Sequence, residues 1–291
     1  MSAWGGSNPA HADPEFVAQE VQRAPGDAAK GPNVTRGRGG RFRAGGGWRL
    51  LGYVVSVVLG FTAYYVASLV SAQVPSYHDL GSSFAGLWRT GLLTDIGISL
   101  FRVLVAFAIA AVAGTASGAL MGWYEPVRVL LEPWVQFLRM IPSLAFIPLF
   151  IVFLGVGEVA KVTVIGLSAF LAIAVSVMLG VRNVDLIYIR AARTLGASTG
   201  VMFRRVILPA TLPYMLVGFR LGLANGWTTL VAAELLGATT GLGYVVENAS
   251  QYNDTAQIII AIIFIGIIGL LMDQSMHRLE RRYGSWQERA R

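Results

Sequence analysis

The sequence has 291 residues, of which 55% are hydrophobic and 13% charged, with a formal net charge of +7. Because a soluble domain carries about 25% charged residues, this composition excludes an ordinary soluble protein and indicates a membrane protein. The sequence has no cysteine, which excludes disulfides and thiolate metal sites, and its three histidines are too far apart to suggest a metal cluster.

Residues 1–47 are rich in Gly, Ala, Pro and Arg and show no apolar period, so we expect a disordered, basic cytoplasmic tail. An apolar run at 48–74 follows a cluster of arginines. A basic flank on the cytoplasmic side of a first transmembrane helix explains that cluster better than a nucleic-acid-binding arm, so no nucleic acid is expected as a partner. The run begins too late and is too long for a signal peptide, and we therefore expect a retained helix.

Five further apolar runs are each near the ~20 residues that cross a bilayer core; they lie at 96–122, 134–156, 161–181, 213–236 and 256–272. The sequence thus predicts an all-α membrane protein with six transmembrane helices. Arginines concentrate in the tail before the first run, in the segment at 182–212 and in the C-terminal segment at 274–291. This asymmetry places both termini and the 182–212 segment in the cytoplasm.

Small residues recur at every fourth position in two of these predicted helices. Glycines 114, 118 and 122 form one stripe, and glycines 218, 222 and 226 form the other. Such stripes allow helix backbones to approach closely in lipid, so we expect both to serve packing. Beside the second stripe lie the polar residues Asn225, Thr228 and Thr229, which should not face lipid. They line a pore or make hydrogen bonds between helices.

Charges inside the predicted helices lie toward the helix ends. Arg220 and Glu234 share a helix but are separated by fourteen residues, or about 21 Å, so they cannot pair. Arg220 is near the inner end, where its side chain can reach the surface. Arg102 and Glu234 both lie near the outer side, so their depths allow an ion pair, although the sequence does not show that they face each other.

The segment RAARTLGASTGVMFRRVILPATLP at 190–213 is a polar, basic island between two apolar runs. We predict two short helices joined by a turn. Leu186, Ile189 and Leu195 give the first helix an apolar side, and Gly196 ends it in a left-handed cap. Ser198 or Thr199 caps the second helix, which Pro209 is expected to stop.

The spacing of Ala191-Ala192, Gly196 and Leu208-Pro209 resembles the loop that permease subunits of bacterial ATP-binding-cassette importers insert into their ATPase. Arg190 stands where that motif usually has Glu, which puts in doubt the salt bridge that the Glu would make. PSLAFIPLFIVFLGVGE at 142–158 is similar to the sulfonate/nitrate/taurine group of these permeases, and GWTTLVAAELLGATTGLGYVVENA at 226–249 resembles taurine permeases most closely. The sequence departs from its relatives at 172–177, where Ala, Ser and Val replace Pro, Asn and Thr.

The resemblance implies a type I importer permease fold in the bacterial inner membrane, with a core at 95–273. Its implied partners are a second permease copy, two cytoplasmic ATPase subunits, an extracytoplasmic binding protein and membrane lipid. ATP and Mg would be bound by the ATPase, so the chain itself is expected to hold no cofactor and to be no enzyme; no phosphate-binding loop motif occurs in it. The residues implied in ATPase coupling are Arg190, Ala191, Ala192, Gly196, Ala197, Ser198, Phe203, Leu208 and Pro209.

The resemblance further implies uptake of a small anionic or zwitterionic solute, with taurine or another aliphatic sulfonate as the expected substrate. We expect neutral polar groups along the path, and Arg102 either serves structure or attracts the sulfonate. Two alternatives stay open: a secondary transporter driven by an ion gradient, and the same importer class with a substrate such as nitrate. The candidate path residues are Ser176, Asn225, Thr228, Thr229, Arg102 and Glu234.

Overall fold

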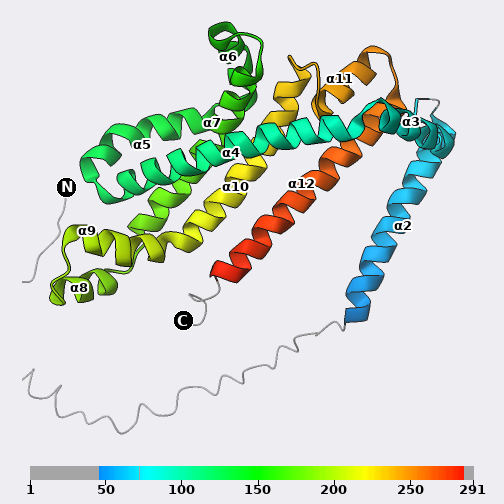
Figure 1. Cartoon of the computed structure of the whole chain (residues 1–291). Helices are drawn as coiled ribbons and strands as arrows, with labels where there is room; N and C mark the ends of the chain where they lie inside the picture. Colours follow the sequence, from blue (N-terminus) through cyan, green and yellow to red (C-terminus); the bar gives the residue numbers. More distant parts are fainter. Residues whose placement is uncertain (1–45, 72, 285–291) are drawn as a thin grey trace, which may run out of the picture. The chain divides into compact units, whose positions relative to one another are not determined.

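A computed structural model describes residues 46–71 and 73–284, and in this part of the chain the regular structure is entirely helical (Figure 1). The predicted tail at 1–47 lies almost wholly outside the described residues. The helices are α2 (Gly46–Val70), α3 (Tyr77–Thr90), α4 (Leu92–Trp123), α5 (Glu125–Met140), η2 (Ser143–Phe146), α6 (Ile147–Leu154), α7 (Glu158–Arg182), α8 (Leu186–Thr194), α9 (Thr199–Met202), η3 (Phe203–Ile207), α10 (Leu208–Leu235), α11 (Leu242–Gln251) and α12 (Thr255–Gly284).

Five helical segments are long and apolar enough to cross a membrane: Leu51–Val70, Leu92–Trp123, Glu158–Arg182, Thr199–Leu235 and Thr255–Tyr283. The pair Glu125–Met140 and Ser143–Leu154 is a sixth candidate if it is counted as one broken span. The chain divides after Gly60 into two units, and the packing described below is that of the second unit.

The third predicted span, at 134–156, is wrong as a single straight helix. α5 ends at Met140, and the two halves of the segment are bent by 97°. Pro142 explains the break, because a proline ring disfavours the helical conformation of the residue before it. Ile141 accordingly has ψ 123° and Pro142 has ψ 128°. The apolar run is thus real, but the chain changes direction inside it.

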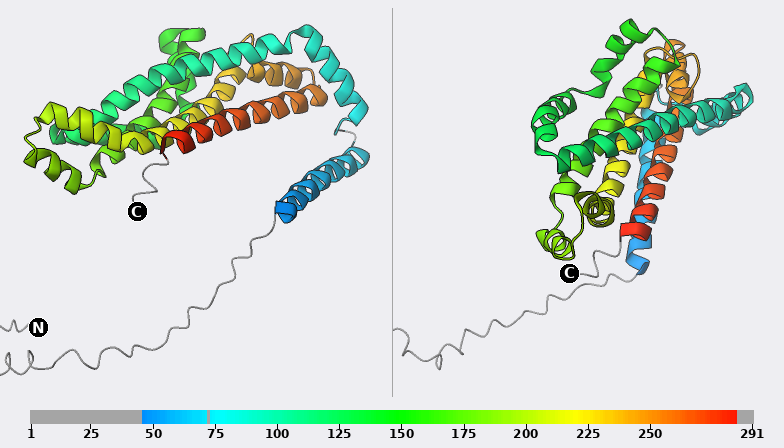
Figure 2. Two further views of the ribbon diagram at one scale, coloured as in Figure 1. Left: turned by 60° about the horizontal axis from the view of Figure 1, so that its bottom comes forward. Right: turned by 60° about the vertical axis from the view of Figure 1, so that its left-hand side comes forward.

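α7 is the central helix of the second unit, with α4 and α10 packed against it (Figure 2). Both glycine stripes face it. A Cβ at Gly118 would lie 2.5 Å from the Ala174 carbonyl oxygen, and one at Gly222 would lie 3.0 Å from that of Ala169. Neither position has room for a side chain, so the packing role predicted for the two stripes is confirmed. In consequence 67% of the apolar window of α7 is buried inside the protein.

α12 packs on the side of α10 and extends beyond the predicted span end at 272, to Gly284. A bidentate ion pair joins the two helices. Arg220 Nε and Nη2 donate to the two carboxylate oxygens of Asp273 at 2.6 and 2.9 Å, and Glu280 lies 3.6 Å from Nη1. The charge of Arg220 is therefore satisfied inside the protein.

Candidate functional site

The segment that resembles an ATPase-docking loop folds as two helices around a turn. Gly196 has φ +74°, a left-handed conformation that favours glycine. Its amide donates to the Arg193 carbonyl at 3.0 Å, and the Ala197 amide donates to the Ala192 carbonyl at 3.0 Å. These two bonds satisfy carbonyls at the end of α8. Gly196 therefore ends the first helix, as predicted.

The second helix begins where expected but does not end where expected. Ser198 is the residue before its first turn, although its side chain makes no capping hydrogen bond. The prediction that Pro209 stops this helix is wrong: α9 continues through the π-helical turn η3 into α10. The Leu208 amide bonds to the Phe203 carbonyl, five residues back. The proline then falls in the first turn of α10, where a missing N–H is tolerated.

The loop presents large apolar side chains to its surroundings. Leu186, Ile189 and Leu195 were predicted to form one apolar side of the first helix. Leu186 and Leu195 are 61% and 88% exposed, and Ile189 is half-buried. The neighbouring Ile187 is also exposed, at 69%. Inward, Ala192, Met202 and Ile207 are buried in a cluster with residues of α4 and α7. The inner face of the loop is thus fixed to the helical core while the outer face is uncovered.

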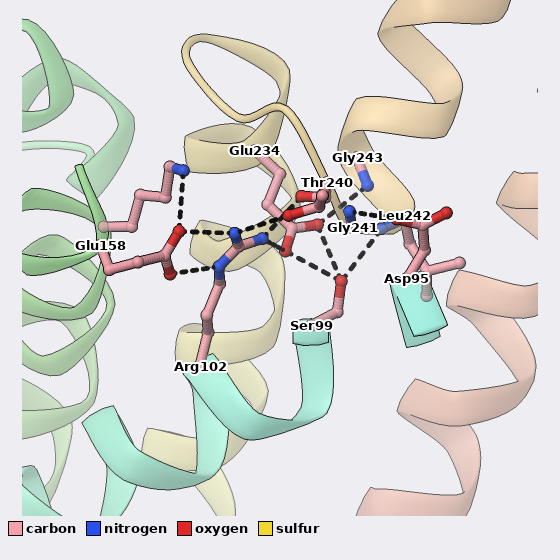
Figure 3. A network of polar contacts seen from close by, with 10 residues as sticks. Asp95, Ser99, Arg102, Glu158, Glu234, Thr240, Gly241, Leu242 and Gly243 are labelled. Carbon is pink, nitrogen blue, oxygen red and sulfur yellow. Dashed lines mark hydrogen bonds and ion pairs between the residues drawn. The ribbon is translucent and has the colours of Figure 1, made fainter. Parts of the chain in front are cut away.

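A second polar centre is formed by Arg102 of α4, Glu158 of α7 and Glu234 of α10 (Figure 3). Nε and Nη2 of Arg102 donate to the two Glu158 carboxylate oxygens, both at 2.6 Å, and Nη1 donates to Glu234 Oε1 at 2.7 Å. The Thr240 carbonyl and hydroxyl accept from Nη1 and Nη2 at 2.7 and 3.2 Å. Arg102 and Glu234, whose depths allowed an ion pair, thus form one, and all five guanidinium N–H groups have an acceptor.

The same centre holds the turn between α10 and α11. Ser99 donates to the Glu234 carboxylate at 2.8 and 2.9 Å and accepts from the Leu242 amide at 3.0 Å. The Gly243 amide donates to Glu234 Oε2 at 2.9 Å. At Gly241, with φ +115°, an added Cβ would collide with the Glu234 carboxylate. We call Ser99, Arg102, Glu158, Glu234 and Thr240 the ion-pair cluster; it is saturated internally, which indicates a structural role.

A separate cavity of about 440 Å³ lies between the break after α5, the middle of α7 and α10. We call it the groove. It brings together the predicted path residues Asn225, Thr228 and Thr229 with Ser168, whose hydroxyl accepts from that of Thr229 at 3.0 Å. Ser176 does not line the groove but packs against Gly218, and Arg102 and Glu234 belong to the ion-pair cluster. The structure thus divides the predicted path residues into three places.

The sequence analysis missed Arg139, which also lines the groove. The sequence does single out Arg139, because it is a charged residue within a predicted apolar span. It stands two residues before Ile141, where the helix breaks. A charge at such a place needs either a carboxylate partner or water.

Comparison with known proteins settles the family. Residues 106–285 match the family described as the binding-protein-dependent transport system inner membrane component. The chain belongs to this family. It is therefore a transport permease subunit with no catalytic role of its own, and a multi-pass protein of the bacterial inner membrane.

Several curated relatives agree with this family. A probable ABC transporter permease protein of Brucella abortus is 45% identical over 239 residues, which cover 81% of this chain and 96% of that protein. The taurine transport system permease protein TauC of Escherichia coli is 39% identical, over 69% of this chain and 72% of TauC. The putative aliphatic sulfonates transport permease protein SsuC of Bacillus subtilis is 36% identical, over 75% of this chain and 80% of SsuC.

The fold has counterparts among solved structures. A chain of the MetNI methionine ABC transporter, in an inward-facing conformation, superposes with a TM-score of 0.59 at 22% identity, covering 66% of this chain and 95% of that chain. The permease fold expected from the loop motif is thereby supported.

Proposed function

We propose that this permease takes up a small anionic or zwitterionic solute, taurine or another aliphatic sulfonate, in an importer driven by ATP. The observation that carries the proposal is the groove, where Asn225 and Thr228 are exposed in the middle of a span, at a depth where polar groups should not face lipid. A permease needs such a polar surface for its solute, and it needs little affinity there, since an extracytoplasmic binding protein selects the solute.

The groove also supports a second copy of the chain as a partner. In the proposed dimer, the grooves of the two copies would face each other and enclose a path. Neutral groups would line most of that path. Arg102 has no donor left for a sulfonate, because all its N–H groups bond within the ion-pair cluster.

The ATPase subunits, which supply the energy for transport, are proposed to dock at residues 185–209. Nothing in this sequence matches a phosphate-binding loop, so the switching energy has to come from a partner that binds ATP. Two cytoplasmic ATPase subunits would receive the exposed Leu186, Ile187 and Leu195, one loop each. Because the inner face of the loop is anchored through Met202 and Ile207, movement of an ATPase subunit would be passed to the helices. This assignment places both chain termini in the cytoplasm.

The decisive experiment measures ATPase activity of the reconstituted complex. Binding protein loaded with taurine or an alkanesulfonate is expected to stimulate hydrolysis, and unloaded protein is not. Stimulation by a nitrate-loaded protein alone would overturn the sulfonate assignment and point to the departure at 172–177. Uptake that follows an imposed ion gradient without ATP would overturn the importer and support the secondary-transporter alternative, which family membership disfavours.

A further inference from the structure

Arg139, at the end of α5, differs from Arg102 and Arg220 in its partners. Arg102 and Arg220 are both held by carboxylates. Arg139 is exposed, and its guanidinium makes no hydrogen bond or ion pair with residues 46–71 or 73–284. Within that part of the chain, the carboxamide of Asn225 is also without a partner. Two sets of uncommitted donors therefore border the same groove.

The groove lies well inside the span of the neighbouring helices. Val135, one turn before Arg139, is buried in a cluster with Leu171, Ala174 and Met178 of α7. Ala172, which lines the groove, is about 21 Å from the first residue of α7 and about 15 Å from its last, at 1.5 Å per residue. Arg139 and Ala172 line the same groove, so Arg139 lies at about the depth of the middle of α7, away from both ends of that helix.

A charge at this depth restricts what can surround it. A guanidinium facing hydrocarbon is strongly disfavoured, and intramembrane arginines face a carboxylate or a water-filled cavity. No carboxylate in the described residues meets Arg139, whereas Asn225, Thr228 and Ser143 line the groove beside it. An Arg139 guanidinium at this depth therefore requires water in the groove, and its charge gives the groove a positive potential.

We propose that Arg139 and the Asn225 carboxamide form a transient anion site in the groove, which receives the sulfonate or other oxyanion group of the transported solute. The inference rests on the function proposed above and names the group that recognises the solute. The planar guanidinium offers paired donors that match two oxygens of an oxyanion. Because the Arg139 side chain is exposed rather than buried, the bound anion would also leave readily, as passage requires.

The absence of cysteine from the sequence allows a direct test of the potential in the groove. In the assembled transporter in membranes, Asn225→Cys supplies one thiol in each permease copy, and its reaction rates with an anionic and a cationic methanethiosulfonate are measured. Exchanging Arg139→Gln in this background is expected to lower the anionic-to-cationic rate ratio about tenfold, since removal of one nearby charge acts oppositely on the two reagents. An unchanged ratio, or a thiol that reacts with neither reagent, would overturn the site.

Arg128→Gln is the matched control, because it removes the same charge from α5 where Arg128 is already paired with Glu125 and Glu132; the ratio should stay as in the parent. Uptake of labelled taurine gives a second readout. Arg139→Gln should raise KM about tenfold and Arg139→Lys much less, whereas equal KM values in all three would contradict the inference. If the parent complex imports no sulfonate, the substrate proposal fails, while the rate ratio still decides the anion site.

Discussion

At the scale of single residues, the structure separates two arginines that are held by carboxylates, Arg102 and Arg220, from Arg139, which borders the groove. Arg102 is 2% exposed and surrounded by acceptors, so its charge is paired with carboxylates inside the protein. Arg139 carries the same charge without a carboxylate in the described residues. From the sequence, Arg102 either served structure or attracted the sulfonate, because depth does not reveal which acceptors meet a side chain.

Removing one carboxylate of the ion-pair cluster should destabilise the fold. Glu234→Gln leaves a buried guanidinium with one carboxylate instead of two and weakens the acceptor for Ser99 and Gly243. We expect a loss of about 3 kcal/mol, as for other broken buried pairs, seen as a lower thermal unfolding midpoint in detergent. Glu125→Gln, which breaks the exposed pair with Arg128, serves as control and should change the midpoint little. Equal midpoints would contradict a structural role for the cluster.

At the scale of helices, close packing on α7 depends on where glycine is placed. Gly97 and Gly118 are both in α4, but a Cβ at Gly97 meets nothing within 4 Å, while one at Gly118 would meet the α7 backbone. The pattern of every fourth residue predicted this packing from sequence. It could not tell which helix the stripes meet, since spacing carries no information on the partner.

Gly97 and Gly118 of α4 give a matched pair of variants. Gly118→Ala should lower stability by about 1–3 kcal/mol, because the methyl group forces α4 away from α7. Gly97→Ala should be neutral or stabilising by up to about 1 kcal/mol, from helix propensity. The yield of folded protein and its unfolding midpoint in detergent measure both. A Gly118→Ala protein as stable as the parent would show that the two helices separate without penalty.

The turn at Gly196 should decide whether ATP hydrolysis is coupled to uptake. Gly196→Val places a β-branched residue at φ +74°, which tilts α8 relative to the helix that follows. We expect ATPase activity to persist while uptake falls at least about tenfold, as for a misplaced positioning element. Gly200→Val, in the same loop without positive φ or near neighbours, should retain coupling. Normal uptake by the Gly196→Val complex would disprove the docking assignment.

At the scale of the whole molecule, hydropathy predicted the all-helical class and five of the long apolar helices. Two predictions from the sequence were wrong for related reasons: the straight helix at 134–156 and the helix end at Pro209. A proline breaks the chain direction at Ile141-Pro142, yet another sits without a break in the first turn of α10, after a π turn. Which outcome a proline has depends on the hydrogen bonds of the preceding residues, and these are set by tertiary packing.

The N-terminal segment should be dispensable for transport. Residues 1–40 lack an apolar period that could pack against the core, so deleting them should leave uptake near that of the parent. Uptake by membranes with matched protein levels provides the measurement. A loss of transport at normal abundance would mean that the segment binds a partner.

The ion-pair cluster also imposes an order on biosynthesis. Arg102 is made 56 residues before Glu158 and 132 residues before Glu234. At 5–20 residues per second, the ribosome needs roughly 7–26 s to supply the second carboxylate. In the first part of that interval, before Glu158 is made, α4 carries the Arg102 charge without a carboxylate, in the N-terminal third of the helix, where the side chain can reach the headgroups. Completion of the ion-pair cluster is therefore a late step in biosynthesis, because it requires Glu234 of α10.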